Sequence, residues 1–322
     1  MVRALRRICA KAGMNMRHHT NIGPEDIIEL LIGAVPERTQ EIKDLWARYN
    51  PKIFLARDAR RLTLDANKER IRFDAKTMDV FWLIGFAGWK AIECYGPVVT
   101  VSATTGQPLS LVIIDDKGLG EIERDYKERR AAAQSLIDAL DPADAPWPDD
   151  IPRPEPNRDA FNSPEFKVAF DLTCLAVAFT FLHEFRHVML DRDCQRPSDL
   201  REEEMLCDVW ARDFMTSNLA KYASQHGHNY ADVLRKRAMG LALSALIVHE
   251  ITPSLDHGGN RSYFSTRDRL HAILNNTKLP NEDHFWVFAA SLLVGIYRQR
   301  GEALNTDPMN AKSLALHLLR EL

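Results

Sequence analysis

The sequence has no long apolar run, no excess of charge of one sign and no recognisable leader. A membrane-spanning helix needs about 20 apolar residues, whereas the longest mostly apolar stretch, Leu172–Leu182, is much shorter. We therefore expect a buried helix there and no membrane span. The basic start, residues 3–17, is not followed by the apolar segment of a signal peptide. The net charge of −3 gives no general basic field, so nucleic-acid binding is not expected as the main function.

Cysteine is also scarce, and its number and spacing argue against a disulfide framework. The number of cysteines is odd, and no two of them form a CxxC pair. We expect reduced thiols in a cytoplasmic protein. The five positions are Cys9, Cys94, Cys174, Cys194 and Cys207.

What is present is an average globular composition, with 45% hydrophobic and 27% charged residues. The pattern of residues 1–140 predicts a mixed α+β region that contains two β-hairpins. The first hairpin pairs RLTLD (61–65) with RIRFD (70–74), and the second pairs residues 98–102 with 110–115. Helices are predicted over 24–32, 37–49, 76–94 and 121–140.

Residues 141–164 contain seven prolines and five aspartates without periodicity, which is typical of a linker or a long surface loop. The region that follows, 165–322, is predicted to be almost wholly helical. We therefore expect an α+β protein whose N-terminal region and helical region are divided by this segment. The expected helices cover 165–190, 199–224, 229–250, 266–275, 281–299 and 309–321.

The chemistry is concentrated near the end of the first of these helices. Ser163-Pro164-Glu165 is a strong helix start, and the helix is apolar on every face until His183, Glu184 and His187. Histidines at i and i+4 project from one face of a helix and can bind one metal ion. Glu184, beside the first histidine, points alongside the metal and can take a proton from a metal-bound water.

The next helix supplies the third ligand that a catalytic zinc ion requires. Asp199 and Glu202 resemble a capping box, which predicts that this helix begins there. Glu204 lies on the inward face and can complete the zinc site. Asp208, one turn later, can accept the other ring N–H of a ligand histidine. The alternative is a histidine pair that contacts only carboxylates of the core.

Further candidates lie after residue 248. His249 is either a satisfied core histidine or a member of the site. A Gly-rich loop follows with His257 and Tyr263, and Tyr263 is the leading candidate for the group that stabilises the oxyanion. His257 and Arg269 are the alternatives for this role.

His-Glu-Phe-Arg-His followed by Glu-Met-Leu-Cys-Asp resembles the HExxH…ExxxD pattern of the gluzincin metallopeptidases. The resemblance implies a zincin-like catalytic part, with His183, His187 and Glu204 as zinc ligands and Glu184 as general base. It also implies that Asp208 stands behind the first histidine. Residues 263–270 resemble the His-Pro-Ser-Thr-x-x-Arg-Ile stretch of membrane-linked gluzincins, but Tyr263 stands where those proteins have histidine.

The layout of the whole chain is similar to the Lit-type phage-exclusion peptidases. This resemblance implies a cytoplasmic zinc endopeptidase with a protein substrate, elongation factor Tu, that is cleaved during phage infection. The competing hypothesis is a regulatory or binding protein that retains a metallopeptidase-like fold without catalysis. An intact Glu184 favours the enzyme, because a purely structural metal site needs no general base.

Overall fold

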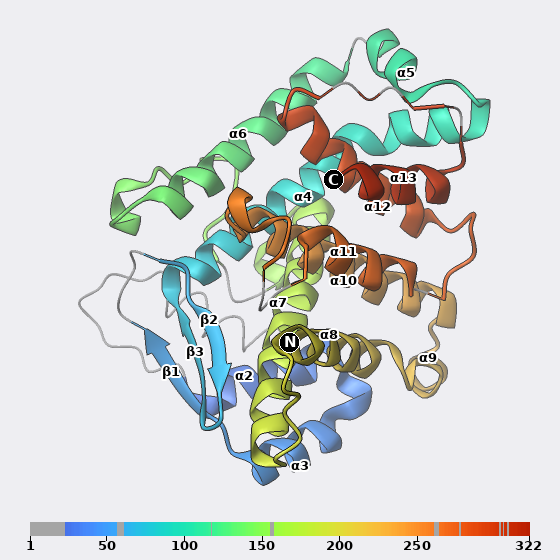
Figure 1. Ribbon diagram of the computed structural model, residues 1–322. Helices are drawn as coiled ribbons and strands as arrows, with labels where there is room; N and C mark the ends of the chain where they lie inside the picture. Colours follow the sequence, from blue (N-terminus) through green and yellow to red (C-terminus); the bar gives the residue numbers. More distant parts are fainter. Residues whose placement is uncertain are drawn as a thin grey trace.

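The computed structural model describes residues 23–322 except 57–60, 117, 155–157, 261–263, 277, 303, 305 and 308. The described part is mostly helical and contains one three-stranded sheet, which is consistent with the α+β expectation. Figure 1 shows helix α7 running through the middle of the molecule, with the sheet on one side and α8 on the other. The basic N-terminal segment lies outside the described residues.

The small sheet confirms a hairpin at the first predicted place, with its first strand at 64–67 rather than 61–65. Strands β2 (Leu64–Asn67) and β3 (Arg70–Asp74) are antiparallel, with Leu64 opposite Phe73. Alternation along β3 buries Ile71 and Phe73, and the Phe73 ring lies edge-on against Phe181 of α7, with 5.2 Å between centroids. Strand β1 (Lys52–Ala56), which the sequence pattern did not predict, pairs with β3 in parallel and gives the order β1-β3-β2.

The second predicted hairpin is wrong. Residues 98–102 continue helix α4 (Ala75–Thr105), and residues 110–115 lie in the short helix α5 (Leu109–Asp115). The β-branched residues Val98 and Val99 are buried in the core, so tertiary packing overrides their strand preference. Between the two segments, Gly106 ends α4 as a left-handed residue with a φ of 68°.

Helix α7 (Pro164–Arg192) begins as expected, because the Ser163 hydroxyl accepts a hydrogen bond from the Phe166 amide. Glycines on its two neighbours permit close packing: a Cβ at Gly85 of α4 would overlap Thr173, and one at Gly240 of α10 would overlap Leu175. Among the described residues, α7 is the one helix long and apolar enough to cross a membrane. However, 89% of its most apolar window is buried inside the protein, as in a core helix.

The other helices cover this core. The predicted helix over 199–224 is divided into α8 (Leu200–Thr216) and α9 (Leu219–His226), because Asn218 adopts a left-handed φ of 62° between them. The remaining helices agree with prediction to within a few residues at their ends. They are α2 (Pro24–Ala34), α3 (Thr39–Tyr49), α6 (Leu119–Asp138), α10 (Tyr230–Ile251), α11 (Thr266–Asn275), α12 (His284–Gln299) and α13 (Ala311–Glu321).

The proline-rich segment 141–164 lies against the core where it is described. Ile151 and Phe161 are buried, and the Trp82 indole of α4 donates a hydrogen bond to the Pro152 carbonyl. Helices from both sides of the segment, α4 and α7, pack against each other. The division of the chain into two regions at this segment stays a prediction.

Candidate active site

The site is built where the C-terminal part of α7 packs against α8. A turn after Arg192 reverses the chain, and Asp199 caps α8 by accepting a hydrogen bond from the Arg201 amide at 2.9 Å. Helix α8 therefore starts where the capping pattern predicts. The reversal brings the residue at position 204 next to the two histidines of α7.

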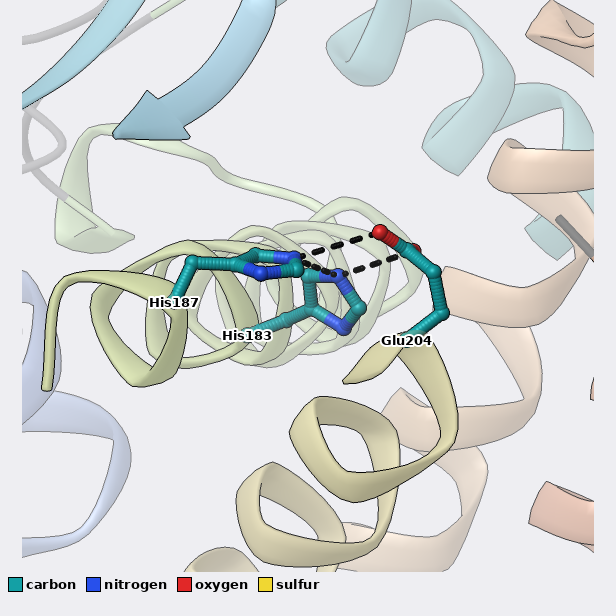
Figure 2. Close-up of side chains that lie close together, drawn as sticks. All are labelled: His183, His187 and Glu204. Carbon is teal, nitrogen blue, oxygen red and sulfur yellow. Dashed lines mark hydrogen bonds and ion pairs between the residues drawn. The ribbon is translucent and has the colours of Figure 1, made fainter. Parts of the chain in front are cut away.

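His183, His187 and Glu204 converge on one point, as Figure 2 shows. Their candidate ligand atoms all lie within 4.8 Å of one another. The two Nε2 atoms are 3.1 Å apart, His183 Nε2 is 3.4 Å from Glu204 Oε2, and His187 Nε2 is 3.3 Å from Glu204 Oε1. These are the three residues that the sequence pattern brings forward as metal ligands, and the cluster could hold a metal ion.

Asp208 lies behind His183, in the position that the spacing predicts. Its Oδ1 atom is 2.8 Å from His183 Nδ1, so the ring N–H at Nδ1 donates to the carboxylate and leaves the Nε2 lone pair facing Glu204. Arg269 of α11 donates to both carboxylate oxygens of Asp208, each at 2.7 Å. Such a two-point contact fixes the carboxylate and keeps it ionised.

His187 has a carboxylate partner that the sequence analysis missed. Glu203 Oε1 is 2.6 Å from His187 Nδ1, and Arg196 Nε donates to Glu203 Oε2 at 2.6 Å. Glu203 is only 1% exposed. The sequence contains a run of three glutamates at 202–204, and nothing local distinguishes the one that reaches Nδ1.

The carboxylates make the two histidines strong binders of a cation. Burial by itself lowers the pKa of His183, but the adjacent Asp208 and Glu204 outweigh it and raise that pKa to about 10. The pKa of His187 is also raised, because hydrogen bonding to Glu204 outweighs burial. Burial would raise the pKa of Glu204, yet the two histidines and Arg269 hold it well below its usual range. A proton or a metal ion at the two Nε2 atoms is therefore stabilised.

Glu184 is placed differently from the three clustered residues. No hydrogen bond of the Glu184 side chain is found among the residues that the structure describes. Burial raises its pKa to about 7, although the nearby His183 and His187 act in the opposite direction. A carboxylate with a pKa close to neutral, beside a cation site, can both take and return a proton.

The site lies within the part of the chain that matches a known protein family. The sequence profile of the peptidase U49 family matches residues 71–289, which is more than half of the chain and includes all the residues above. The chain belongs to the peptidase U49 family. It is also similar to the cell death peptidase of Escherichia coli (strain K12), with 22% identity over 176 residues.

Membership in this family and the name of the relative both support a peptidase function. The similarity to the relative covers 55% of this chain and 56% of the relative, so the chain spans little more than half the length of that curated protein. No solved structure matches the chain. The zincin-like character of the helical region stays a prediction.

The loop after α10 carried the candidates for oxyanion stabilisation. Tyr263 lies outside the described residues, so its role stays a prediction. The Nε2–H of His257 donates to the carbonyls of His249 and Thr252, at 3.1 and 2.9 Å, and its ring lies tilted against that of His249, with 4.2 Å between centroids. His257 therefore holds the loop onto the end of α10. Arg269 directs its Nε and Nη2 atoms to Asp208, while Nη1 lies 3.9 Å from Glu204.

His249 is a buried histidine with its own partners. Arg300 donates to its Nε2 atom at 3.1 Å, so its Nδ1–H donates to the Thr266 hydroxyl at 3.2 Å. Burial, reinforced by His257, Arg300 and Arg130, lowers the pKa of His249 to about 3. The structure therefore supports the interpretation of His249 as a core histidine. Its neutral ring is buried where α10, α11 and the end of α12 meet.

This histidine is expected to make the fold sensitive to acid. Below pH 6.5 the unfolded chain binds a proton at His249 that the folded chain does not bind, so stability falls as the pH drops toward about 3. Between pH 7 and pH 5 the loss from this one group is about 2 kcal/mol. The free energy of unfolding, measured with urea at pH 7 and at pH 5, should differ less between the two pH values for His249→Gln than for the wild type. The same substitution at the exposed His271 should leave the difference unchanged; equal differences for His249→Gln and wild type would disprove the assignment.

Proposed function

We propose that this protein is a zinc-dependent endopeptidase in which His183, His187 and Glu204 hold the zinc ion and Glu184 is the general base. The observation that carries the proposal is the convergence of two imidazole Nε2 atoms and one carboxylate on a single point, beside the Glu184 carboxylate, which has no side-chain hydrogen bond within the described part of the chain. The peptidase family supports the hydrolytic part of the proposal.

The donor set fits zinc, which binds histidine nitrogen and carboxylate oxygen. The two Nε2 atoms are 3.1 Å apart, and each faces a different oxygen of Glu204, at 3.4 Å for His183 and 3.3 Å for His187. One ligand atom from each residue can be chosen so that all three lie within 4.8 Å of one another. Both Nδ1 atoms are engaged by carboxylates, which directs the free lone pairs to the common point.

The chain's own residues account for the proton transfers. A zinc ion in such a site polarises a carbonyl group and makes water more acidic. Glu184 accepts the proton of the attacking water and delivers it to the amine of the departing peptide. Tyr263 is proposed to donate a hydrogen bond to the oxygen that becomes negatively charged, because a phenol can donate at neutral pH without titrating.

A non-catalytic binding protein with the same fold is the competing function. Its histidines would need only the carboxylates Asp208, Glu203 and Glu204 as partners. That arrangement leaves no role for Glu184, whose carboxylate is raised in pKa beside the cluster and has no partner in the described part of the chain. The peptidase is therefore the better-supported proposal.

The proposed substrate is a cytoplasmic protein, and the first one to test is elongation factor Tu. The resemblance to the Lit-type phage-exclusion peptidases supports this choice, as does the similarity to a relative named cell death peptidase. Cleavage would then act in defence against phage infection. Neither nucleic acid nor a membrane is part of the proposal.

The proposal predicts about one zinc ion per chain and cleavage that a chelator prevents. Protein purified without added metal should contain zinc by metal analysis. After incubation with a bacterial lysate, fragments of the substrate should be found by mass spectrometry, and neither chelated protein nor Glu184→Gln should produce them. A zinc content below about a tenth of an ion per chain, without uptake on titration, would disprove the zinc site.

A further inference from the structure

The two histidines differ in how their outer carboxylates are held. Asp208, behind His183, is held by Arg269, whose side chain is 18% exposed and which makes two hydrogen bonds. Glu203, behind His187, is held by Arg196, whose side chain is 45% exposed and which makes one hydrogen bond to it. The Glu203 carboxylate behind His187 is therefore held by a half-exposed arginine.

The geometry of α8 explains how adjacent glutamates reach different atoms. Consecutive residues point about 100° apart around a helix, so Glu204 faces the Nε2 atoms while Glu203 faces His187 Nδ1. At 1% exposure, the polar oxygens of Glu203 are cut off from water and need hydrogen-bond partners within the protein. Its two oxygens are shared between His187 and Arg196.

Arg196 comes from the turn between α7 and α8, and other contacts tie this turn to the rest of the fold. Its Nη1 atom lies 3.5 Å from Asp191, at the end of α7. Asp193 in the same turn accepts hydrogen bonds from Tyr49 and Arg48 of α3, at 2.6 and 3.1 Å. These contacts hold the backbone from which Arg196 reaches Glu203.

We propose that Glu203 is the positioning residue for His187, that Arg196 holds the Glu203 carboxylate in its orientation, and that this pair sets the zinc affinity of the site. The inference rests on the proposed function, because it assigns the pair an effect on the same zinc ion. It adds two residues to the proposed site. Glu203 acts by orienting His187, and Arg196 acts only by holding Glu203.

Chelator competition against each purified variant measures the zinc affinity, with no need for a substrate. Glu203→Gln should weaken zinc binding by about 10–100-fold, the usual effect of removing a partner of a metal-binding histidine. Asp208→Asn is the positive control, since it removes the corresponding partner of His183. Glu202→Gln, at the exposed neighbour, is the matched control and should bind zinc like the wild type.

The role of Arg196 is tested by a double-mutant cycle. Arg196→Gln should weaken zinc binding in the wild type by several-fold, yet have no further effect in Glu203→Gln, because the group through which it acts is absent. Arg196→Lys should bind zinc more tightly than Arg196→Gln, because lysine keeps the positive charge. Arg192→Gln is the control, because Arg192 ends α7 near the same turn but donates to the Lys68 carbonyl.

The outcomes separate the two proposals. If the wild type binds zinc tightly but Glu203→Gln binds it equally well, this inference is wrong and the zinc peptidase stands. The inference is also wrong if Arg196→Gln weakens zinc binding by the same factor in the wild type and in Glu203→Gln. If the wild type binds no zinc, both proposals fail. Thermal unfolding of each metal-free variant identifies misfolded protein, and the half-exposed Arg196 variants keep the test decisive if Glu203→Gln does not fold.

Discussion

Replacing Glu184 by glutamine is expected to slow peptide hydrolysis by about 10²–10⁴-fold while the zinc content stays at the wild-type level. The amide has nearly the shape of the carboxylate but cannot accept the proton of the attacking water. Glu184 is not one of the three clustered ligands, so its loss should not release the metal ion. The rate is measured on the substrate identified by lysate cleavage, and zinc by metal analysis of the same sample.

The control for this variant is Glu165→Gln, an exposed position at the start of the same helix. It should retain both rate and zinc. The metal-free Glu184→Gln protein should be at least as stable as the wild type, because it removes an acid whose ionised form is disfavoured by burial. Substantial turnover by Glu184→Gln would show that another group activates the water.

The features that the sequence predicts well are those set by local geometry. His183 and His187 are four residues apart within a helix, so their common face follows from the helical repeat alone. The start of α8 follows from Asp199, whose side chain does cap the helix. Together these bring the start of α8 near the two histidines, and the spacing of Glu204 to Asp208, with the gluzincin resemblance, selects Glu204 as the third member of the cluster.

The partners of that cluster depend on tertiary packing and are harder to foresee. Which of Glu202, Glu203 and Glu204 points at which histidine atom is decided by the rotation of α8 against α7, and one residue's difference changes the direction by about 100°. Arg196 lies in a turn without periodicity. Its contact with Glu203 is a consequence of how the turn folds back.

The strand errors have a similar origin. β2 and β3 are joined by a two-residue turn, so their pairing is local and their alternation is informative. β1 pairs in parallel with β3, the second strand of the hairpin, so its partner is distant in the sequence. The sequence carries no local signal for such a pairing. Val98 and Val99 favour strands in isolation, but the continuous burial along α4 stabilises the helical alternative.

The largest effect on metal binding is expected from Glu204. Glu204→Gln replaces an anionic ligand by a neutral amide that binds zinc poorly, so the zinc affinity should fall by more than the roughly 100-fold that marks the upper range for outer partners. Hydrolysis should be lost together with the metal, in contrast to Glu184→Gln. Chelator competition measures the affinity, and Glu202→Gln on the same helix serves as the control.

The same variant links the metal to folding. A ligand that binds only the folded state at 100 times its dissociation constant stabilises that state by about 2.7 kcal/mol. The wild type should gain stability of this order when zinc is added to the metal-free protein, measured by urea unfolding. Glu204→Gln should gain almost none at the same zinc concentration, because the two histidines alone leave the coordination incomplete. An equal gain for variant and wild type would mean that zinc binds elsewhere, and the assignment of His183, His187 and Glu204 as its ligands would then be wrong.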